Sequence, residues 1–198
     1  MLSKQRDYFN RRAAEWSDDL SAAQAESLEE IMTVLSPETG EKILDLGCGA
    51  GILTERLTRG MTGEERKLVS VDLAEEMVKR VRRDYSRLSS AVCGAAEELP
   101  LAARSFDRII CFSVFPHFSS PRSVLEEINR LLVPGGRAVI AHVDSRQQLN
   151  QFHSNLKGVV SADILPPLEE LQEIIQAAGL RVLQMDEREN LYLAVFGK

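Results

Sequence analysis

Short apolar runs alternate with amphipathic stretches along most of the chain. The runs predict buried strands at residues 43–46, 68–71, 91–93, 108–112 and 138–141. Between them, apolar residues recur at every third or fourth position, which predicts helices over residues 51–59, 73–88 and 121–132. This alternation predicts a doubly wound α/β sheet with an antiparallel edge.

The two ends of the chain extend this layout. Residues 1–36 are predicted to be helical, with an apolar face that ends before Pro37. The C-terminal part is predicted to hold a short helix at 147–153, an irregular segment at 158–167, a helix at 168–178, and strands at 180–185 and 191–196 around a loop at 186–190. Turns are predicted around Gly60 and Gly63 and at 133–137. The basic residues of the helix after the second strand are interpreted as a solvated outer face, and they are Lys79, Arg80, Arg82, Arg83 and Arg87.

A glycine-rich loop joins the first strand to its helix. Gly47, Gly49 and Gly51 follow the strand on alternate residues, a pattern that lets a ligand approach the backbone. A dinucleotide site would need its third glycine where Ile52 stands, and Asp45 would repel a pyrophosphate. A cationic ligand suits that carboxylate better.

This loop resembles motif I of the class I S-adenosylmethionine-dependent methyltransferases, in the form Leu44-Asp45-Leu46-Gly47-Cys48-Gly49-Ala50-Gly51. The resemblance implies a Rossmann-like sheet of seven strands in the order 3-2-1-4-5-7-6, with the last strand antiparallel. It also implies S-adenosylmethionine as cofactor, an N-terminal helical lid that includes Tyr8, and an acceptor-side insertion at 145–166. The group most similar to this chain comprises small single-domain methyltransferases akin to those of quinone and sterol biosynthesis.

Asp72 ends the second strand. An acidic residue there can accept hydrogen bonds from both ribose hydroxyls of a nucleoside. It could equally cap the helix that begins at once after it, and the two roles are compatible.

The segment Gly94–Pro100 is similar to the Gly-Asp-Ala-x-x-Leu-Pro motif of the same superfamily, whose Asp usually bonds the adenine amino group. Ala95 occupies that Asp position here, so backbone groups near Ala96 or the Glu97 side chain are the alternative contacts. The full set of expected cofactor-binding residues is Tyr8, Asp45, Gly47, Cys48, Gly49, Gly51, Asp72, Leu73, Met77, Ala95, Ala96, Glu97, Phe112 and Ser113.

Three histidines are the candidate catalytic residues. His117 follows the fourth strand, in a loop that resembles a methyltransferase motif with a His pair, and Pro116 replaces the first of that pair. His142 ends the fifth strand, and His153 falls in the insertion, so all three side chains could border one pocket. Each could serve as a base or orient the acceptor, or be a structural group, and their spacing matches no metal motif.

Bulk properties limit the alternatives. A length of 198 residues predicts one domain, and the net charge of −6 argues against a general nucleic-acid binder. No apolar run is long enough to span a bilayer, and the first residues are too polar for a signal peptide. Three unpatterned cysteines suggest a reducing compartment, so we expect a cytoplasmic protein. We expect it to be a monomer or a homodimer.

The sequence thus predicts a methyltransferase that displaces a methyl group in line from sulfonium to an N, O, S or C atom of a small-molecule acceptor. A nucleotide-dependent oxidoreductase is disfavoured by Ile52 and Asp45. A non-catalytic S-adenosylmethionine-binding module or partner subunit with this fold is the remaining alternative, to which Ala95 and Pro116 point.

Overall fold

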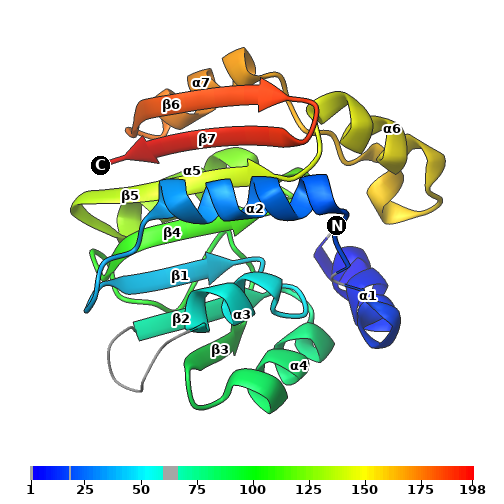
Figure 1. Ribbon diagram of the computed structural model, residues 1–198, viewed down its shortest axis with the longest axis horizontal. Helices are drawn as coiled ribbons and strands as arrows, with labels where there is room; N and C mark the ends of the chain where they lie inside the picture. The colour runs from blue at the N-terminus through cyan, green and yellow to red at the C-terminus, as the bar shows by residue number, and fades with distance from the viewer. Residues whose placement is uncertain (1, 18, 60–66) are drawn as a thin grey trace.

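One seven-stranded sheet organises the chain. The computed structural model describes residues 2–17, 19–59 and 67–198. The strands lie in the order β3-β2-β1-β4-β5-β7-β6 (Figure 1), and they are β1 (Lys42–Leu46), β2 (Lys67–Asp72), β3 (Ser89–Cys93), β4 (Phe106–Phe112), β5 (Leu132–His142), β6 (Arg181–Arg188) and β7 (Leu191–Gly197). The first five run parallel, and β7 runs antiparallel to both of its neighbours. The predicted order and the antiparallel last strand are confirmed.

Helices cover both faces of this sheet. They are α1 (Leu2–Arg12), α2 (Ala22–Leu35), α3 (Ile52–Thr58), α4 (Glu75–Tyr85), α5 (Pro121–Leu131), α6 (Arg146–Asn155) and α7 (Leu168–Ala177), with short 3-10 turns η1 (Ala13–Glu15), η2 (Phe115–His117) and η3 (Val159–Ala162). In Figure 1, α2, α3 and α4 lie in front of the sheet, while α5 and α7 lie behind it. Among the described residues, every helix is too short or too polar to span a lipid bilayer.

Neighbouring residues of the central strands face opposite layers of the core. Leu44 and Ile109 pack with α5 and α7, whereas Ile43 and Ile110 pack with α2 and α3. All four side chains are fully buried. Burial on both faces explains why these strands read as continuous apolar runs.

Two predicted boundaries are wrong. The predicted turn at 133–137 lies inside β5, because Phe106 pairs with Leu132 and Arg108 pairs with Arg137, so the intervening residues form an irregularity in the ladder. The loop predicted at 186–190 is shorter, because β6 continues to Arg188. These polar residues extend an edge strand, where charged side chains are tolerated in solvent. The turn predicted around Gly60 and Gly63 lies outside the described residues.

The basic face of α4 is only partly a solvated surface. Arg80 donates hydrogen bonds to the carbonyls of Ala13, at 2.7 Å, and Trp16, at 3.0 Å. Arg82 donates twice to the Ala91 carbonyl, at 3.1 and 2.8 Å. Arg82 is exposed all the same, so the interpretation as an outer face holds for it, whereas Arg80 is half-buried and fastens the N-terminal segment to α4.

Candidate functional site

The glycine loop between β1 and α3 lies against two neighbouring strands. The amides of Gly47 and Cys48 donate to the Val71 carbonyl at 2.7 and 2.9 Å. Gly47, Gly49 and Gly51 all have positive φ, at 82°, 51° and 109°. Glycine takes this conformation at little cost, so the sequence pattern is matched to the path of the backbone.

Asp72 connects that loop to the next turn. One carboxylate oxygen accepts from the Gly49 amide at 2.9 Å, and the other accepts from the Ala74 amide at 2.8 Å. Burial raises the pKa of this carboxyl group. Each carboxylate oxygen can accept a second hydrogen bond, so these backbone contacts leave Asp72 able to bind a ligand.

Asp45 is a buried carboxylate with one unsatisfied oxygen. Its Oδ2 accepts from Thr54 at 3.2 Å, while its Oδ1 has no hydrogen-bond partner among the described residues. Burial is the main cause that raises its pKa to about 7, against the lowering effect of the Thr54 hydrogen bond. An unpaired buried carboxylate is costly and would be stabilised by a cationic ligand.

This burial predicts a dependence of stability on pH that replacement of Asp45 would remove. The folded state holds the proton more tightly than the unfolded state, so the stabilisation is complete below pH 4 and is lost as the pH rises to about 7. Asp45→Asn mimics the protonated acid. At pH 8 we expect the free energy of unfolding of the ligand-free variant, measured with urea, to exceed that of the wild type by about 2–4 kcal/mol. At pH 4 the two proteins should differ little. An equal difference at both pH values would contradict the assignment.

A hollow of about 690 Å³, called the main cavity here, lies at the carboxyl ends of the strands. The expected cofactor residues that line it are Gly47, Gly49, Asp72, Leu73, Met77, Ala95, Ala96, Glu97 and Ser113. A second hollow, called the acidic hollow, contains Asp19, Asp45 and Asp144 and shares Gly47, Gly49, Ser113 and Trp16 with the main cavity. The expected residues Cys48 and Phe112 line this second hollow. The two hollows therefore lie next to each other at the glycine loop.

Two expected cofactor residues lie elsewhere. Gly51 precedes α3, and a side chain there would meet Tyr85 and Val81. Tyr8 belongs to the lining of neither the main cavity nor the acidic hollow among the described residues, whereas its neighbour Phe9 lines the main cavity. Tyr8 and Phe9 are adjacent in the sequence, and no signal there distinguishes which ring faces the cavity.

Ala95 has no carboxylate and cannot make the adenine contact that the family's Asp makes at this position. Ala95 and Ala96 form part of the cavity wall. Glu97 also lines the cavity, and its Oε1 accepts from the Ser119 amide at 3.1 Å. Glu97 therefore ties the loop after β3 to the loop after β4.

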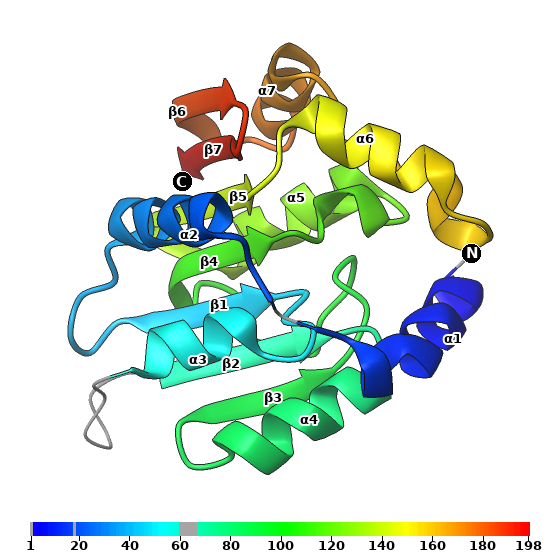
Figure 2. The same cartoon turned by 45° about the vertical axis from the view of Figure 1, so that its right-hand side comes forward.

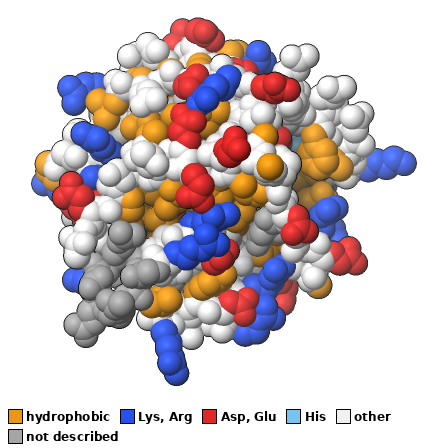
Figure 3. All heavy atoms as spheres, in the orientation of Figure 1, with side chains coloured by type: hydrophobic (Ala, Val, Ile, Leu, Met, Phe, Trp, Pro, Cys, Tyr) orange, Lys and Arg blue, Asp and Glu red, His pale blue; other side chains and the backbone are white. Residues whose placement is uncertain are grey.

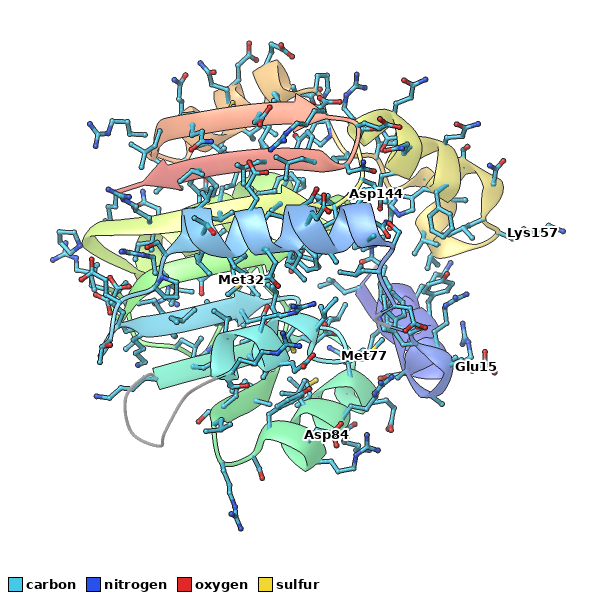
Figure 4. All side chains as sticks on the ribbon, viewed as in Figure 1. Glu15, Met32, Met77, Asp84, Asp144 and Lys157 are labelled. Atoms are coloured by element: carbon cyan, nitrogen blue, oxygen red, sulfur yellow. The ribbon has the colours of Figure 1, made fainter. Side chains whose placement is uncertain are left out.

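The N-terminal segment crosses the main cavity. The side chain of Gln5, which is 4% exposed, donates to the His117 carbonyl at 2.9 Å and accepts from Ser119 at 3.2 Å. Phe9 and Trp16 pack on Met77, which projects from α4 toward this segment (Figure 4). Both ribbon views place α1 beyond the arrowheads of β1 and β4 (Figures 1 and 2). These contacts match the position expected for a lid.

Two of the three histidines lie side by side, and one of them lines the main cavity. Nδ1 of His117 lies 2.6 Å from the Asp163 carboxylate, and the two side chains are only 16% and 12% exposed. The His153 ring lies 5.1 Å from the His117 ring, and its Nδ1 lies 2.8 Å from the Asp163 carbonyl oxygen. His117 also lines the main cavity. Asp163 was not anticipated, since it comes from an irregular segment with no recognisable motif.

The expectation for His142 is wrong. Its side chain is 1% exposed, packs against the Tyr192 ring at 6.0 Å, and lines none of the hollows around the glycine loop. Burial lowers its pKa to about 3, so the ring is neutral near pH 7. Within the described part of the chain, no group of three or more His, Cys, Asp or Glu side chains is placed to hold a metal ion.

Comparisons with known proteins agree with this geometry. A family described as "Methyltransferase domain" matches residues 44–140. An O-methyltransferase of Penicillium expansum, cnsE, is 30% identical over 190 residues, which cover 89% of this chain and 67% of that protein. The biotin biosynthesis bifunctional protein BioHC of Cellvibrio japonicus is 29% identical over 74% of this chain, which spans only 29% of that longer protein. The fold is similar to that of a SAM-dependent methyltransferase from Aquifex aeolicus, with a TM-score of 0.69 and 22% identity over 99% of this chain and 97% of that one.

Proposed function

The chain belongs to the S-adenosylmethionine-dependent methyltransferases, and on that premise we propose that it methylates a hydroxyl oxygen of a small molecule, with His117 as the proton acceptor. The observation that carries the proposal is that His117, in the wall of the main cavity, is bonded to the Asp163 carboxylate. Names of relatives support oxygen as the target atom, since several are O-methyltransferases.

The residues around the glycine loop fit the methyl donor. We place the adenosine in the main cavity, with Asp72 accepting from the ribose hydroxyls, and the amino-acid end in the acidic hollow. The unpaired Oδ1 of Asp45 suits the donor's ammonium group. When bound there, S-adenosylmethionine supplies an activated methyl group on its sulfonium sulfur.

The Asp163 carboxylate determines which nitrogen of His117 can act. A carboxylate accepts but cannot donate, so the neutral imidazole must carry its proton on Nδ1. The lone pair is then on Nε2, which can take a proton from an acceptor hydroxyl. General-base assistance of this kind contributes roughly 10²- to 10⁴-fold to a rate.

The cavity walls supply the rest of the rate enhancement by alignment. The sulfonium is already a good leaving group, so the main requirement is an acceptor oxygen held in line with the methyl–sulfur bond. Such positioning contributes up to roughly 7–11 kcal/mol in favourable cases. Ser113 has a positive φ of 51°, and residues held in this strained region are frequent at such sites.

Labelled donor tests the proposal directly. We expect the purified protein, incubated with methyl-labelled S-adenosylmethionine and a small-molecule extract, to form a labelled methyl ether and S-adenosylhomocysteine. Label found only on nitrogen, sulfur or carbon would refute the choice of oxygen. Formation of no labelled product, in a protein that binds S-adenosylhomocysteine, would refute the proposed activity on small molecules.

Asp72→Ala tests the placement of the ribose. Hydrogen bonds to a charged group are worth roughly 1.5–3 kcal/mol each, so we expect S-adenosylhomocysteine affinity to fall at least tenfold by calorimetry. Because Asp72 also binds the Gly49 amide, the thermal transition should be measured alongside. A folded variant with unchanged affinity would show that this carboxylate serves only the loop.

A further inference from the structure

A third hollow adjoins the main cavity on the side of the insertion. It has a volume of about 370 Å³ and lies between α1, η2, α6 and η3. We call it the ring hollow, because its walls include the rings of Tyr8, Phe9, Trp16, His117, Phe152 and His153. Figure 2 shows α1 and α6 approaching each other at this edge of the molecule.

We propose that the ring hollow seats the methyl acceptor, and that the acceptor is a planar phenol. This inference rests on the proposed function and names the substrate class of the same site. Phe9, Trp16 and His117 line both the main cavity and the ring hollow. A hydroxyl on a ring held in this hollow can therefore meet His117 on the side where the donor binds.

The rings form a connected array. Phe9 packs edge-to-face against Tyr8, Trp16 and His117, with centroids 5.2, 6.0 and 5.1 Å away. His117 continues the array to His153 at 5.1 Å, and Phe152 follows at 6.0 Å. Aromatic faces and edges stabilise a further ring by stacking and edge-to-face contact, so a flat ring fits this wall better than a sugar or a flexible chain.

Phe152 is a large apolar side chain that remains mostly exposed although its ring lies next to His153. It is 58% exposed, at the rim of the hollow on α6. Hydrophobic side chains gather at the right of the molecule, where α6 and α1 meet (Figure 3). Exposed apolar surface at the edge of a pocket is typical of a binding site.

The formal charge in the lining of the hollow is positive. Arg12 is the only formally charged side chain in its described lining, and its guanidinium lies 5.7 Å from the Tyr8 ring. The Asp163 carboxylate is bonded to His117. A neutral or anionic ring suits this charge better than a positively charged amine does.

A phenol also suits a histidine base. A phenolic hydroxyl, with a pKa of about 10, gives up its proton to a base far more readily than an alkyl alcohol does. In the reaction, the phenol O–H bond breaks and its proton goes to His117 Nε2. The oxygen lone pair forms the bond to the methyl carbon, and the methyl–sulfur electron pair leaves with sulfur. The products are an aryl methyl ether, S-adenosylhomocysteine and a protonated His117, which returns its proton to solvent.

Calorimetry with a model phenol tests whether the ring hollow binds the acceptor. The full chain is saturated with S-adenosylhomocysteine and titrated with 2-naphthol, and separately with decahydro-2-naphthol, which has the same skeleton but is not planar. We expect 2-naphthol to bind at least tenfold more tightly. Phe152→Ala should weaken 2-naphthol at least fivefold and leave S-adenosylhomocysteine affinity unchanged.

Leu183→Ala is the matched control, because Leu183 is also an exposed apolar residue, at 42%, and lies on β6 away from the hollow. It should change neither affinity. Equal binding of the two alcohols, no binding of 2-naphthol, or an unchanged affinity in Phe152→Ala would overturn the seat while the proposed function stands. Failure of the wild type to bind S-adenosylhomocysteine would overturn both.

Discussion

His117→Gln should slow methyl transfer by about 10²- to 10⁴-fold and leave S-adenosylhomocysteine affinity within about twofold of the wild type. The glutamine retains a polar side chain of similar reach but has no nitrogen lone pair to take a proton. His117 is positioned by its own 3-10 turn and by the Gln5 contact to its carbonyl, so the loop should keep its path in the variant. The rate is measured with saturating methyl-labelled S-adenosylmethionine and the acceptor that the labelling experiment identifies.

His153→Gln is the matched comparison, since it removes the neighbouring imidazole but not the ring bonded to the Asp163 carboxylate. We expect a loss below tenfold. A wild-type rate in His117→Gln would exclude the general base. A loss of rate with an equal loss of S-adenosylhomocysteine affinity would assign His117 to donor binding instead.

Asp163 acts through His117 and is a positioning residue. Nitrogen-15 spectra of labelled protein should show the neutral His117 ring protonated on Nδ1, and Asp163→Asn should shift the population toward the Nε2-protonated form, because an amide can donate to Nδ1. A residue that only supported the fold would leave the tautomer unchanged. The same spectra therefore separate positioning from simple packing.

The residues around the glycine loop could be predicted because local sequence determines where they lie. Asp45, the glycines and Asp72 are placed by strand ends, and every such end of a parallel sheet lies at one edge. Asp163 and Phe9 were not predictable in their roles. Asp163 meets His117 across 46 positions of sequence, from an irregular segment whose path depends on tertiary contacts.

For His142, the position in the strand is predicted correctly, but the face of the sheet toward which the side chain points is not. Its position at the end of β5 was predicted well, but side chains alternate along a strand, and both faces of a central strand are covered. His142 shares its face with Ile140 and Ala138, which lie in the core beneath α5 and α7. Because His142 alternates in step with these apolar residues, the strand pattern itself predicts an imidazole in the core.

Gly47→Ala should reduce both stability and cofactor affinity severely. A Cβ atom there would lie 2.3 Å from Val114 Cγ2 and 2.7 Å from Val114 Cβ, and the backbone has a φ of +82°. Left-handed backbone costs a non-glycine residue roughly 1–2 kcal/mol, and overpacking adds about 1–3 kcal/mol. We expect urea unfolding to show a loss of about 2–5 kcal/mol.

Gly40→Ala separates these two causes. Gly40 has nearly the same φ, +88°, but a Cβ there would meet no atom within 4 Å. This variant should lose only the backbone share, about 1–2 kcal/mol, and keep its affinity for S-adenosylhomocysteine. Adding Val114→Ala to Gly47→Ala should restore part of the difference, because the nearest methyl groups are removed.

The contact matters because Gly47 lets two functional loops touch. The loop after β1 binds the donor in our proposal, and the loop after β4 carries Val114, Ser113 and His117. A side chain at position 47 must push these loops apart, which widens the distance between donor and base. The fall in S-adenosylhomocysteine affinity should therefore be accompanied by a further fall in the transfer rate at saturating donor. Equal losses of stability in Gly47→Ala and Gly40→Ala would show that the approach to Val114 is not restrictive.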